Sequence, residues 1–135
     1  MTQEQKDLLI KDLCGRLSHR VKCKILETNE VKILGAIQYD GDNTLFDFWE
    51  DSRKIQYDYQ LYLSEFKPYL FPLSSMTEEQ KIEYDYLYSI IFSCFEDGLS
   101  EAIAKLHDWL NKNHFDYRGL IPKDLANDAT GLNIY

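Results

Sequence analysis

Three side chains with catalytic potential alternate within a five-residue stretch of the last quarter of the chain: His114, Asp116 and Arg118. In an extended segment all three would lie on one side. They could then act as a general base, an orienting carboxylate and an anion clamp. On a helix the three would diverge. A hydrolase reading therefore requires extended backbone and an adjoining pocket.

The same residues also have a structural interpretation, which we favour. Asp116 could pair with Arg118 or cap a short helix, and His114 would suit the negative end of a preceding helix. Phe115 and Tyr117 would then fill core. The chain contains no HExxH, Walker, GxGxxG or GxSxG motif, so no recognised catalytic spacing supports the enzyme reading.

A metal centre would need ligands from distant parts of the chain. His107 and His114 are seven residues apart, on one helical face but two turns distant. A zinc site would need a third ligand, such as Cys94 or Glu83. The three cysteines fit neither a zinc pair nor a disulfide framework. We expect no metal and no cofactor.

A basic N-terminal segment suggests a nucleic-acid alternative. Residues 1–24 carry a net +3, and the cations that would form the binding face are Lys11, Arg16, Arg20, Lys22 and Lys24. Against this, the whole chain has a net charge of −8, and residues 77–101 carry −6. That balance opposes nonspecific binding to phosphate backbones and to anionic lipid. The basic face could instead meet an acidic partner or the protein's own acidic helix.

An aromatic-rich centre predicts either core packing or a protein interface. Its tyrosines alternate with polar residues, and those assigned to the interface are Tyr57, Tyr59, Tyr62 and Tyr69. Tyrosine favours interfaces because its ring can be buried while its hydroxyl finds a partner. Stacking of bases is a further option for such rings. Six acids within residues 40–60 would repel a nucleic-acid backbone.

The elements that would position these residues predict an α+β fold of 135 residues. Thr2 with Gln5 forms a capping box that opens a helix over 2–15. Period-two patterns over 20–72 predict short antiparallel strands, with hairpin turns at 27–30 and 39–43. The strand over 55–63 is the least regular, and the prolines of 66–73 restrict pairing of that segment to a sheet edge or to strand ends. The result would be a small bent antiparallel sheet or an SH3-like or Sm-like barrel.

A helical region over 76–126 should follow the strands, within a single domain. Thr77 with Gln80, or Ser75 with Glu78, predicts a cap at its start. The stripe expected to be buried in the first of these helices contains Ile82, Tyr86, Leu87, Ile90, Ile91, Cys94 and Phe95. A second helix should run from about 100 to 112. Residues 113–126 should be short helical or irregular pieces, and 127–135 reads as a loose tail.

Two long strings resemble a family of small uncharacterised proteins from gut Bacteroidetes and their phages. They are Lys67-Pro-Tyr-Leu-Phe-Pro-Leu-Ser-Ser-Met-Thr-Glu-Glu-Gln-Lys81 and Trp109-Leu-Asn-Lys-Asn-His-Phe-Asp-Tyr-Arg-Gly-Leu-Ile-Pro-Lys123. The opening Leu8-Leu-Ile-Lys-Asp-Leu-Cys14 is also similar, whereas residues 25–65 are the least alike, and Asp124 stands where the family more often has Gly. The resemblance implies a bacterial or phage cytoplasm and an accessory role on a mobile element. It assigns no substrate or catalytic residue.

We therefore predict a cytoplasmic, noncatalytic protein-binding or regulatory module. The polar N-terminus lacks a signal-peptide pattern, and no stretch has the length to cross a bilayer. An unknown protein is the expected partner, and self-association is compatible with the same surface. The alternatives are an Sm-like or SH3-like nucleic-acid binder and, second, a hydrolase built on residues 114–118.

Overall fold

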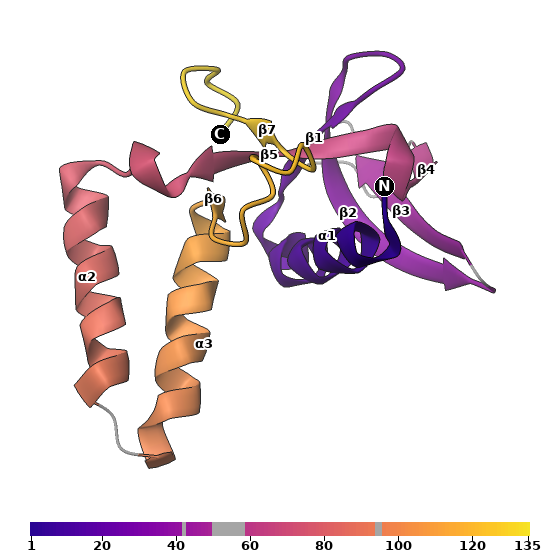
Figure 1. Cartoon of the computed structure of the whole chain (residues 1–135). Coiled ribbons are helices and arrows are strands. Elements are labelled where there is room, and N and C mark those ends of the chain that lie inside the picture. Colours follow the sequence, from indigo (N-terminus) through magenta and orange to yellow (C-terminus); the bar gives the residue numbers. More distant parts are fainter. Residues whose placement is uncertain (42, 50–58, 94–95) are drawn as a thin grey trace.

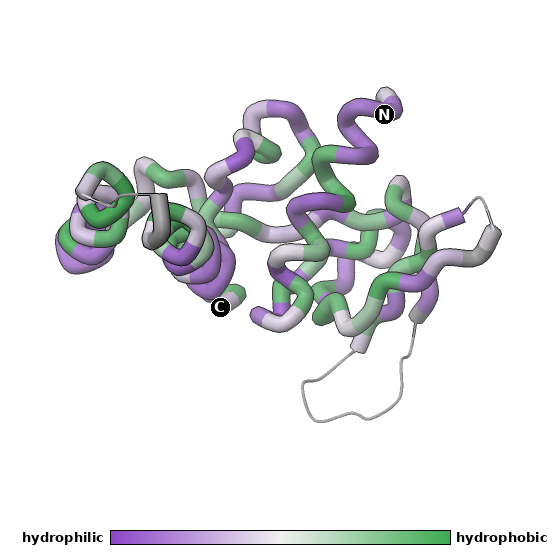
Figure 2. The backbone as a smooth tube through the Cα atoms, turned by 90° about the horizontal axis from the view of Figure 1, so that it is seen from below, coloured by the Kyte–Doolittle hydropathy of each residue, from purple (hydrophilic) through white to green (hydrophobic). Residues whose placement is uncertain are grey.

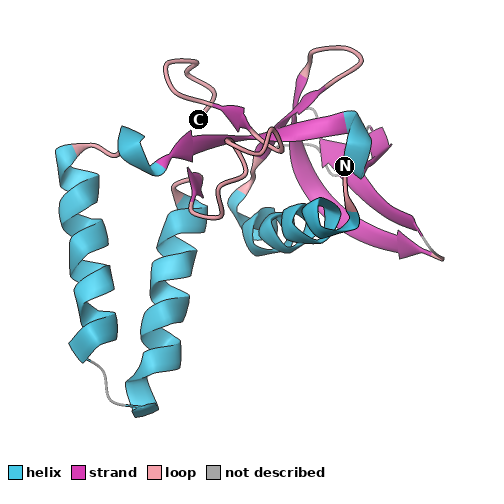
Figure 3. Cartoon of the chain, in the orientation of Figure 1, coloured by secondary structure: helices cyan, strands magenta, loops and turns pink. Residues whose placement is uncertain are grey.

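The protein has an α+β fold, as predicted. The computed structural model describes residues 1–41, 43–49, 59–93 and 96–135. An N-terminal helix is followed by a mixed, mostly antiparallel sheet and then by two C-terminal helices (Figures 1 and 3). The first helix packs on the sheet, and the last two project from it as a hairpin.

Helix α1 (Gln3–Arg16) begins with the predicted capping box. The backbone N–H of Gln5 donates to the Thr2 hydroxyl at 3.1 Å, and the N–H of Thr2 donates to the Gln5 side chain at 2.9 Å. Both bonds satisfy donors that a helix start leaves free. The buried face of α1 combines apolar and charged residues, namely Leu9, Asp12, Leu13 and Arg16.

The antiparallel part of the sheet confirms the predicted meander. Strands β1 (Lys22–Ile25), β2 (Val31–Asp40) and β3 (Asn43–Trp49) pair in sequence. Gly41 has a φ of +59°, which fits the Asp-Gly turn that the sequence indicates. Strand β4 (Tyr59–Tyr62) confirms the end of the strand expected over 55–63. The rest of that prediction lies outside the described residues.

The sheet is open, and the barrel alternative is wrong for the described part of the chain. Its strand order is β4-β3-β2-β1-β5-β6, with β7 also paired to β5. Strand β5 is Phe66–Pro72, β6 is Phe115–Asp116 and β7 is Asn127–Asp128. The two C-terminal strands cover the edge of β5 that β1 leaves free. The edge is therefore protected by chain from the far end of the sequence instead of by closure.

Because of its prolines, β5 was expected to pair only along an edge or at strand ends. The strand is not at an edge, but Pro72 is its last residue. Strand β5 pairs with β1 on one side, with Cys23 opposite Pro68. The Leu26 N–H donates to the Glu65 carbonyl at 3.0 Å. Hydrogen-bonded and non-hydrogen-bonded pairs alternate along an antiparallel ladder, so Pro68 falls in a non-hydrogen-bonded pair. The ladder loses no bond at this proline.

Part of the sheet is parallel, because a long connection separates β5 from β6. The sequence predicted antiparallel strands alone, since the loops between the early strands are short. Strand β5 runs parallel to both β6 and β7. Helices α2 (Glu78–Ser93) and α3 (Glu96–Lys112) supply the long crossover that parallel strands require. Beyond Lys112 the chain is extended or turning, so the helical region ends well before residue 126.

The C-terminal residues are docked and do not form a loose tail. The Ala129 N–H donates to the Leu70 carbonyl at 2.8 Å. The Tyr135 hydroxyl receives the Lys22 N–H at 2.8 Å and donates to the Tyr69 carbonyl at 2.8 Å. It therefore bridges β1 and β5 just beyond their last paired residues. These partners are distant in sequence, so no local periodicity reports them.

Two hydrophobic clusters lie beside β5. The larger lies between α1 and the sheet and includes Leu13, Phe46, Phe66 and Leu120. The smaller lies at the root of the hairpin and comprises Met76, Leu106, Leu110 and Phe115 with partly buried neighbours. Figure 2 shows the hairpin to one side of the sheet, so the outer parts of its helices are not covered by the larger cluster.

Substituting Gly35 with alanine should destabilise the sheet. An ideal Cβ at this position would lie 2.1 Å from Nε1 of Trp49, beside the irregularity between Leu34 and Ala36. Displacing the indole should cost about 1–3 kcal/mol of unfolding free energy, measured by urea denaturation. In a Trp49→Ala background the same substitution should cost much less. An equal loss in both backgrounds would contradict the steric cause.

Candidate functional site

The predicted triad does not assemble into one reaction centre. Asp116 is buried, and its two carboxylate oxygens accept the backbone N–H groups of Leu120 and Ile121, each at 2.8 Å. These bonds close the turn that follows β6. The carboxylate therefore faces its own backbone instead of orienting the imidazole of His114.

Arg118 points toward helix α1. Its Nε lies 3.4 Å from Oδ1 of Asp12, and its guanidinium lies 5.0 Å from the centre of the Tyr117 ring. None of four cavities in the described part of the chain is lined by His114, Asp116 or Arg118. The geometry thus favours the structural interpretation of this segment.

Arg16, assigned from the sequence to a nucleic-acid face, is instead buried in an ion pair. Its Nε and Nη2 reach the two oxygens of Asp12 at 2.7 and 3.1 Å, and Nη2 also donates to the Phe115 carbonyl at 2.6 Å. Both side chains have no solvent exposure. A buried guanidinium needs such partners to offset its lost hydration. The pair joins α1 to β6.

An aromatic side chain covers this ion pair. The Arg16 guanidinium lies 5.3 Å from the centre of the Tyr117 ring, and the Tyr117 hydroxyl donates to Oδ1 of Asn111 at 2.9 Å. His107 stacks on the same ring at 5.2 Å. The sequence segment that looked catalytic therefore wraps around a buried charge from α1.

His114 anchors the C-terminal segment. Its backbone has a φ of +60°, in the left-handed region that histidine tolerates better than most residues. Its ring stacks on Tyr135 with 3.6 Å between ring centres. The Nδ1 atom is buried without a hydrogen-bond partner in the described part of the chain. Burial, and then the charges of Arg16, His19 and Lys22, lowers the pKa of His114 to about 4. The imidazole is therefore neutral near pH 7.

The remaining predicted cations are only partly available to a ligand. Lys11 and Arg20 are exposed, but the Lys22 amine donates to the Ile134 carbonyl and lies over the Tyr135 ring. Lys24 is half-buried and lies opposite Lys67 on the neighbouring strand. With Arg16 buried as well, two of the five predicted cations hold the fold together and are not presented to a ligand.

The predicted tyrosine interface is also dispersed. Tyr57 lies outside the described residues, and only the backbone of Tyr59 is described. Tyr62 is 51% exposed on β4, whereas Tyr69 is buried on β5. Three other strands separate β4 from β5 in the sheet order. Tyr69 cannot serve as an interface residue while buried, because its carbonyl and ring belong to the docked C-terminus and the core.

The described residues also bear on metal binding and on membrane insertion. No group of three His, Cys, Asp or Glu side chains is placed to hold a metal ion there. His107 and His114 stack on different tyrosines, and Glu83 accepts a hydrogen bond from the Trp109 indole at 2.7 Å. Within those same residues, no helix combines the length and the apolar character needed to cross a membrane.

Helix α2 carries the surface that the sequence assigned to the core. Ile82 is 70% exposed, Tyr86 is 66% exposed and Phe92 is 75% exposed. No residue of α2 is fully buried among those described. The expected buried stripe is therefore wrong at Ile82 and Tyr86, while Leu87, Ile90 and Ile91 are half-buried, and Cys94 and Phe95 lie outside the described residues.

A signal for this exposure was present in the sequence. Apolar residues of α2 occupy three stripes of four-residue spacing: Ile82, Tyr86 and Ile90; Leu87 and Ile91; and Tyr84, Tyr88 and Phe92. A helix with one side against a core needs a single stripe, whereas one that is apolar all round has further surface to cover. Only the side facing α3 is partly covered in this chain.

The hairpin is fixed at its root. The Thr77 hydroxyl and Gln80 side chain form the predicted capping box at the start of α2, with bonds of 3.1 and 2.9 Å. Leu87 and Ile91 pack against the cluster that contains Leu106. Outward from this root the two helices extend away from the sheet, as Figure 1 shows.

A chain of aromatic rings leads from the root to the exposed part of α2. Trp109 stacks on the buried Phe115 at 5.7 Å and lies 6.3 Å from Tyr84. Tyr84 then stacks on Tyr88 at 5.8 Å, and Tyr88 contacts Phe92 at 5.1 Å. The inner rings hold the outer ones in place, so Phe92 is presented to solvent by a preorganised row.

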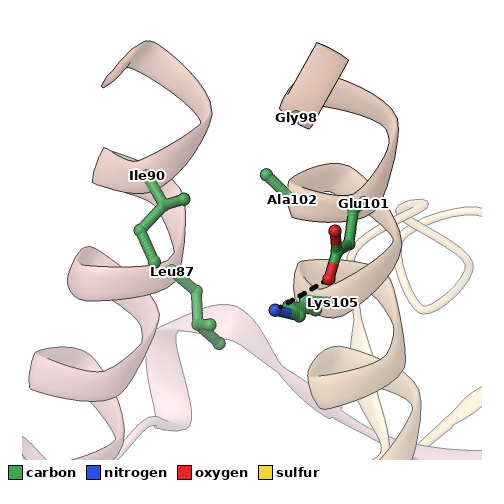
Figure 4. A pocket seen from close by; sticks show the side chains of 6 residues that line it. All are labelled: Leu87, Ile90, Gly98, Glu101, Ala102 and Lys105. Atoms are coloured by element: carbon green, nitrogen blue, oxygen red, sulfur yellow. Dashed lines mark ion pairs between the residues drawn. The ribbon is translucent and has the colours of Figure 1, made fainter. Parts of the chain in front are cut away.

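A groove lies between α2 and α3 on the other side of the hairpin. It has a volume of about 190 Å³ and is lined by Leu87, Ile90, Gly98, Glu101, Ala102 and Lys105. Figure 4 shows Leu87 and Ile90 facing Ala102 across the groove. An ion pair of 3.1 Å between Glu101 and Lys105 lies along its α3 side. The floor is apolar and the rim is charged.

Comparison with protein-family models, with curated proteins and with solved structures finds no match to this chain.

Breaking the buried ion pair should destabilise the protein strongly. Arg16→Met removes the bidentate partner of Asp12 and the donor to the Phe115 carbonyl, so it should cost about 3–5 kcal/mol of unfolding free energy. Adding Asp12→Leu should recover part of that loss. Urea denaturation measures both effects. Lys11→Met, an exposed neighbour on α1, serves as control; an equal cost there would contradict the role of the pair.

Stability should fall as the pH drops from about 6.5 to 4, because the unfolded chain then binds a proton at His114 that the folded chain refuses. The loss should approach the order of 3 kcal/mol below pH 4. His114→Asn, which tolerates the positive φ, should remove this component, whereas the exposed His107→Asn should keep it. Denaturation curves across this pH range measure the difference. Identical profiles for wild type and His114→Asn would refute the assignment.

Proposed function

We propose that this protein is a noncatalytic protein-binding module that docks its partner through the exposed apolar surface of α2. The observation that carries the proposal is the exposure of Ile82, Tyr86 and Phe92 on a helix with no fully buried residue among those described. Single exposed apolar residues are ordinary on protein surfaces, but a contiguous group of large ones is typical of interaction sites.

The form of the hairpin supports this role. Its root is packed and capped, so α2 is held in a defined position before any partner arrives. Preorganisation reduces the entropy lost on association. Exposed aromatic residues such as Tyr86, Tyr88 and Phe92 are the types enriched in interface cores. The α2 surface thus combines the aromatic composition of an interface with a fixed position.

The other two readings have less support in the geometry. A nucleic-acid-binding face would need Arg16 and Lys22, but both are held in internal hydrogen bonds. A hydrolase would need the Asp116 carboxylate, which instead accepts backbone N–H groups. The resemblance noted in the sequence leads us to propose further that the module serves a phage or mobile element in a bacterial cytoplasm.

A site-specific crosslinking experiment tests the proposal. A photoreactive phenylalanine analogue replacing Phe92 should yield a discrete crosslinked product in bacterial cells, and adding Ile82→Ser and Tyr86→Ser should reduce its yield. The three side chains are exposed, so the thermal unfolding midpoint should change little.

The matched control places the same photoreactive residue at Tyr39, which is 73% exposed on β2. It should give no such product. Equal crosslinking from both positions, or no discrete product from position 92, would overturn α2 as the binding surface.

A further inference from the structure

We propose that the groove between α2 and α3 binds a basic amphipathic helix of the partner, which inserts one large apolar side chain between Leu87, Ile90 and Ala102. This inference rests on the proposed binding function and names the chemistry of the partner. Three features of the hairpin support it: the size of the groove, the stripe beside it and the charge around it.

The size of the groove fits one side chain. Its volume of about 190 Å³ is similar to that of a cavity of roughly 150 Å³ that accommodates a benzene ring. A drug-sized ligand normally needs a pocket of about 300 Å³ or more. Leu87 and Ile90 on one side and Ala102 on the other give the groove apolar walls. A phenylalanine or leucine is therefore the occupant of matching size and polarity.

The stripe beside the groove extends the contact to a helix. Ile82, Tyr86 and Ile90 follow one another at four-residue spacing, and Ile90 also lines the groove. A partner helix lying along α2 would place its anchor in the groove and a second apolar residue one or two turns away against Tyr86. This is the arrangement by which amphipathic helices dock in apolar grooves.

The charge around the groove favours a basic partner. Residues 78–112 contain eight acids and three lysines, a net charge of −5. Glu79 and Glu83 lie on the α2 side that carries the stripe, and on the α3 rim Glu101 is paired with Lys105 at 3.1 Å. A second copy of the hairpin would bring the same negative charge to the interface. Cationic side chains flanking the anchor would instead meet these carboxylates.

Selection from a displayed library of amphipathic helical peptides, varied in charge and in the anchor residue, tests the inference. Peptides enriched by the wild-type protein should carry net positive charge and one Phe or Leu anchor. For the best peptide, resynthesised with a fluorescent label, replacing the anchor by Ala should weaken binding about tenfold or more, measured by anisotropy.

Variants of the protein separate the groove from the rest of the surface. Glu101→Lys should weaken binding of the basic peptide several-fold, whereas the same change at Glu27, which is also exposed and lies in the β1–β2 turn, should not. Ala102→Leu should fill the groove and exclude the anchor. Since Ala102 is buried, Ile90→Ser provides a second groove variant, and circular dichroism verifies that each variant is folded.

Enrichment of acidic or anchor-free peptides, or no enrichment at all, would overturn the inference. Dimerisation of the protein through the hairpin, seen as a concentration-dependent mass in sedimentation that Ile90→Ser abolishes, would also overturn it. Crosslinking from position 92 that persists in either case would leave the binding function standing and reject only the partner chemistry. If the peptide selection fails and position 92 also gives no discrete crosslinked product, both the partner chemistry and the binding function are rejected.

Discussion

The buried contact of Arg16 with Asp12 and the Phe115 carbonyl is the constraint on which the arrangement of the chain depends. It joins the first helix to the strand that follows the last helix. A guanidinium without solvent exposure tolerates few alternative placements, because each would leave a charge without partners. The stretch after α3 is consequently held against α1, and the polar residues there serve this contact.

Beyond the contact of Arg16 with Phe115, the C-terminal segment completes the sheet. His114 leaves α3 in a left-handed conformation, β6 and β7 line the free edge of β5, and Tyr135 bridges β5 and β1. The hairpin of α2 and α3 is therefore the connection between the parallel strands β5 and β6. Because only its root is packed, the outer part of α2 remains available to another molecule. The exposure of α2 and the covering of the free β5 edge are thus consequences of the same topology.

Sequence reasoning was accurate where structure is local. Both capping boxes, the β1–β2–β3 meander and the Asp-Gly turn follow from residues that contact near neighbours. It failed where two partners are far apart in the chain. The sheet-edge alternative for β5, the loose tail and the barrel were all wrong, because each depends on where residues 115–135 return. The buried stripe of α2 was wrong at Ile82 and Tyr86 for a related reason: apolar spacing reports that a helix has a face to cover, and not which molecule covers it.

The amino-acid sequence by itself determined the fold class, most element starts and the acidic character of the hairpin, since these follow from backbone preferences, short-range bonds and composition. Only the tertiary structure decided that Arg16 is internal, that the Asp116 carboxylate closes a turn and that α2 is exposed. The physical reason is that burial is a property of the neighbours a side chain acquires. Those neighbours come from opposite ends of this chain, brought together by a buried charge and by strands that pair across more than forty residues.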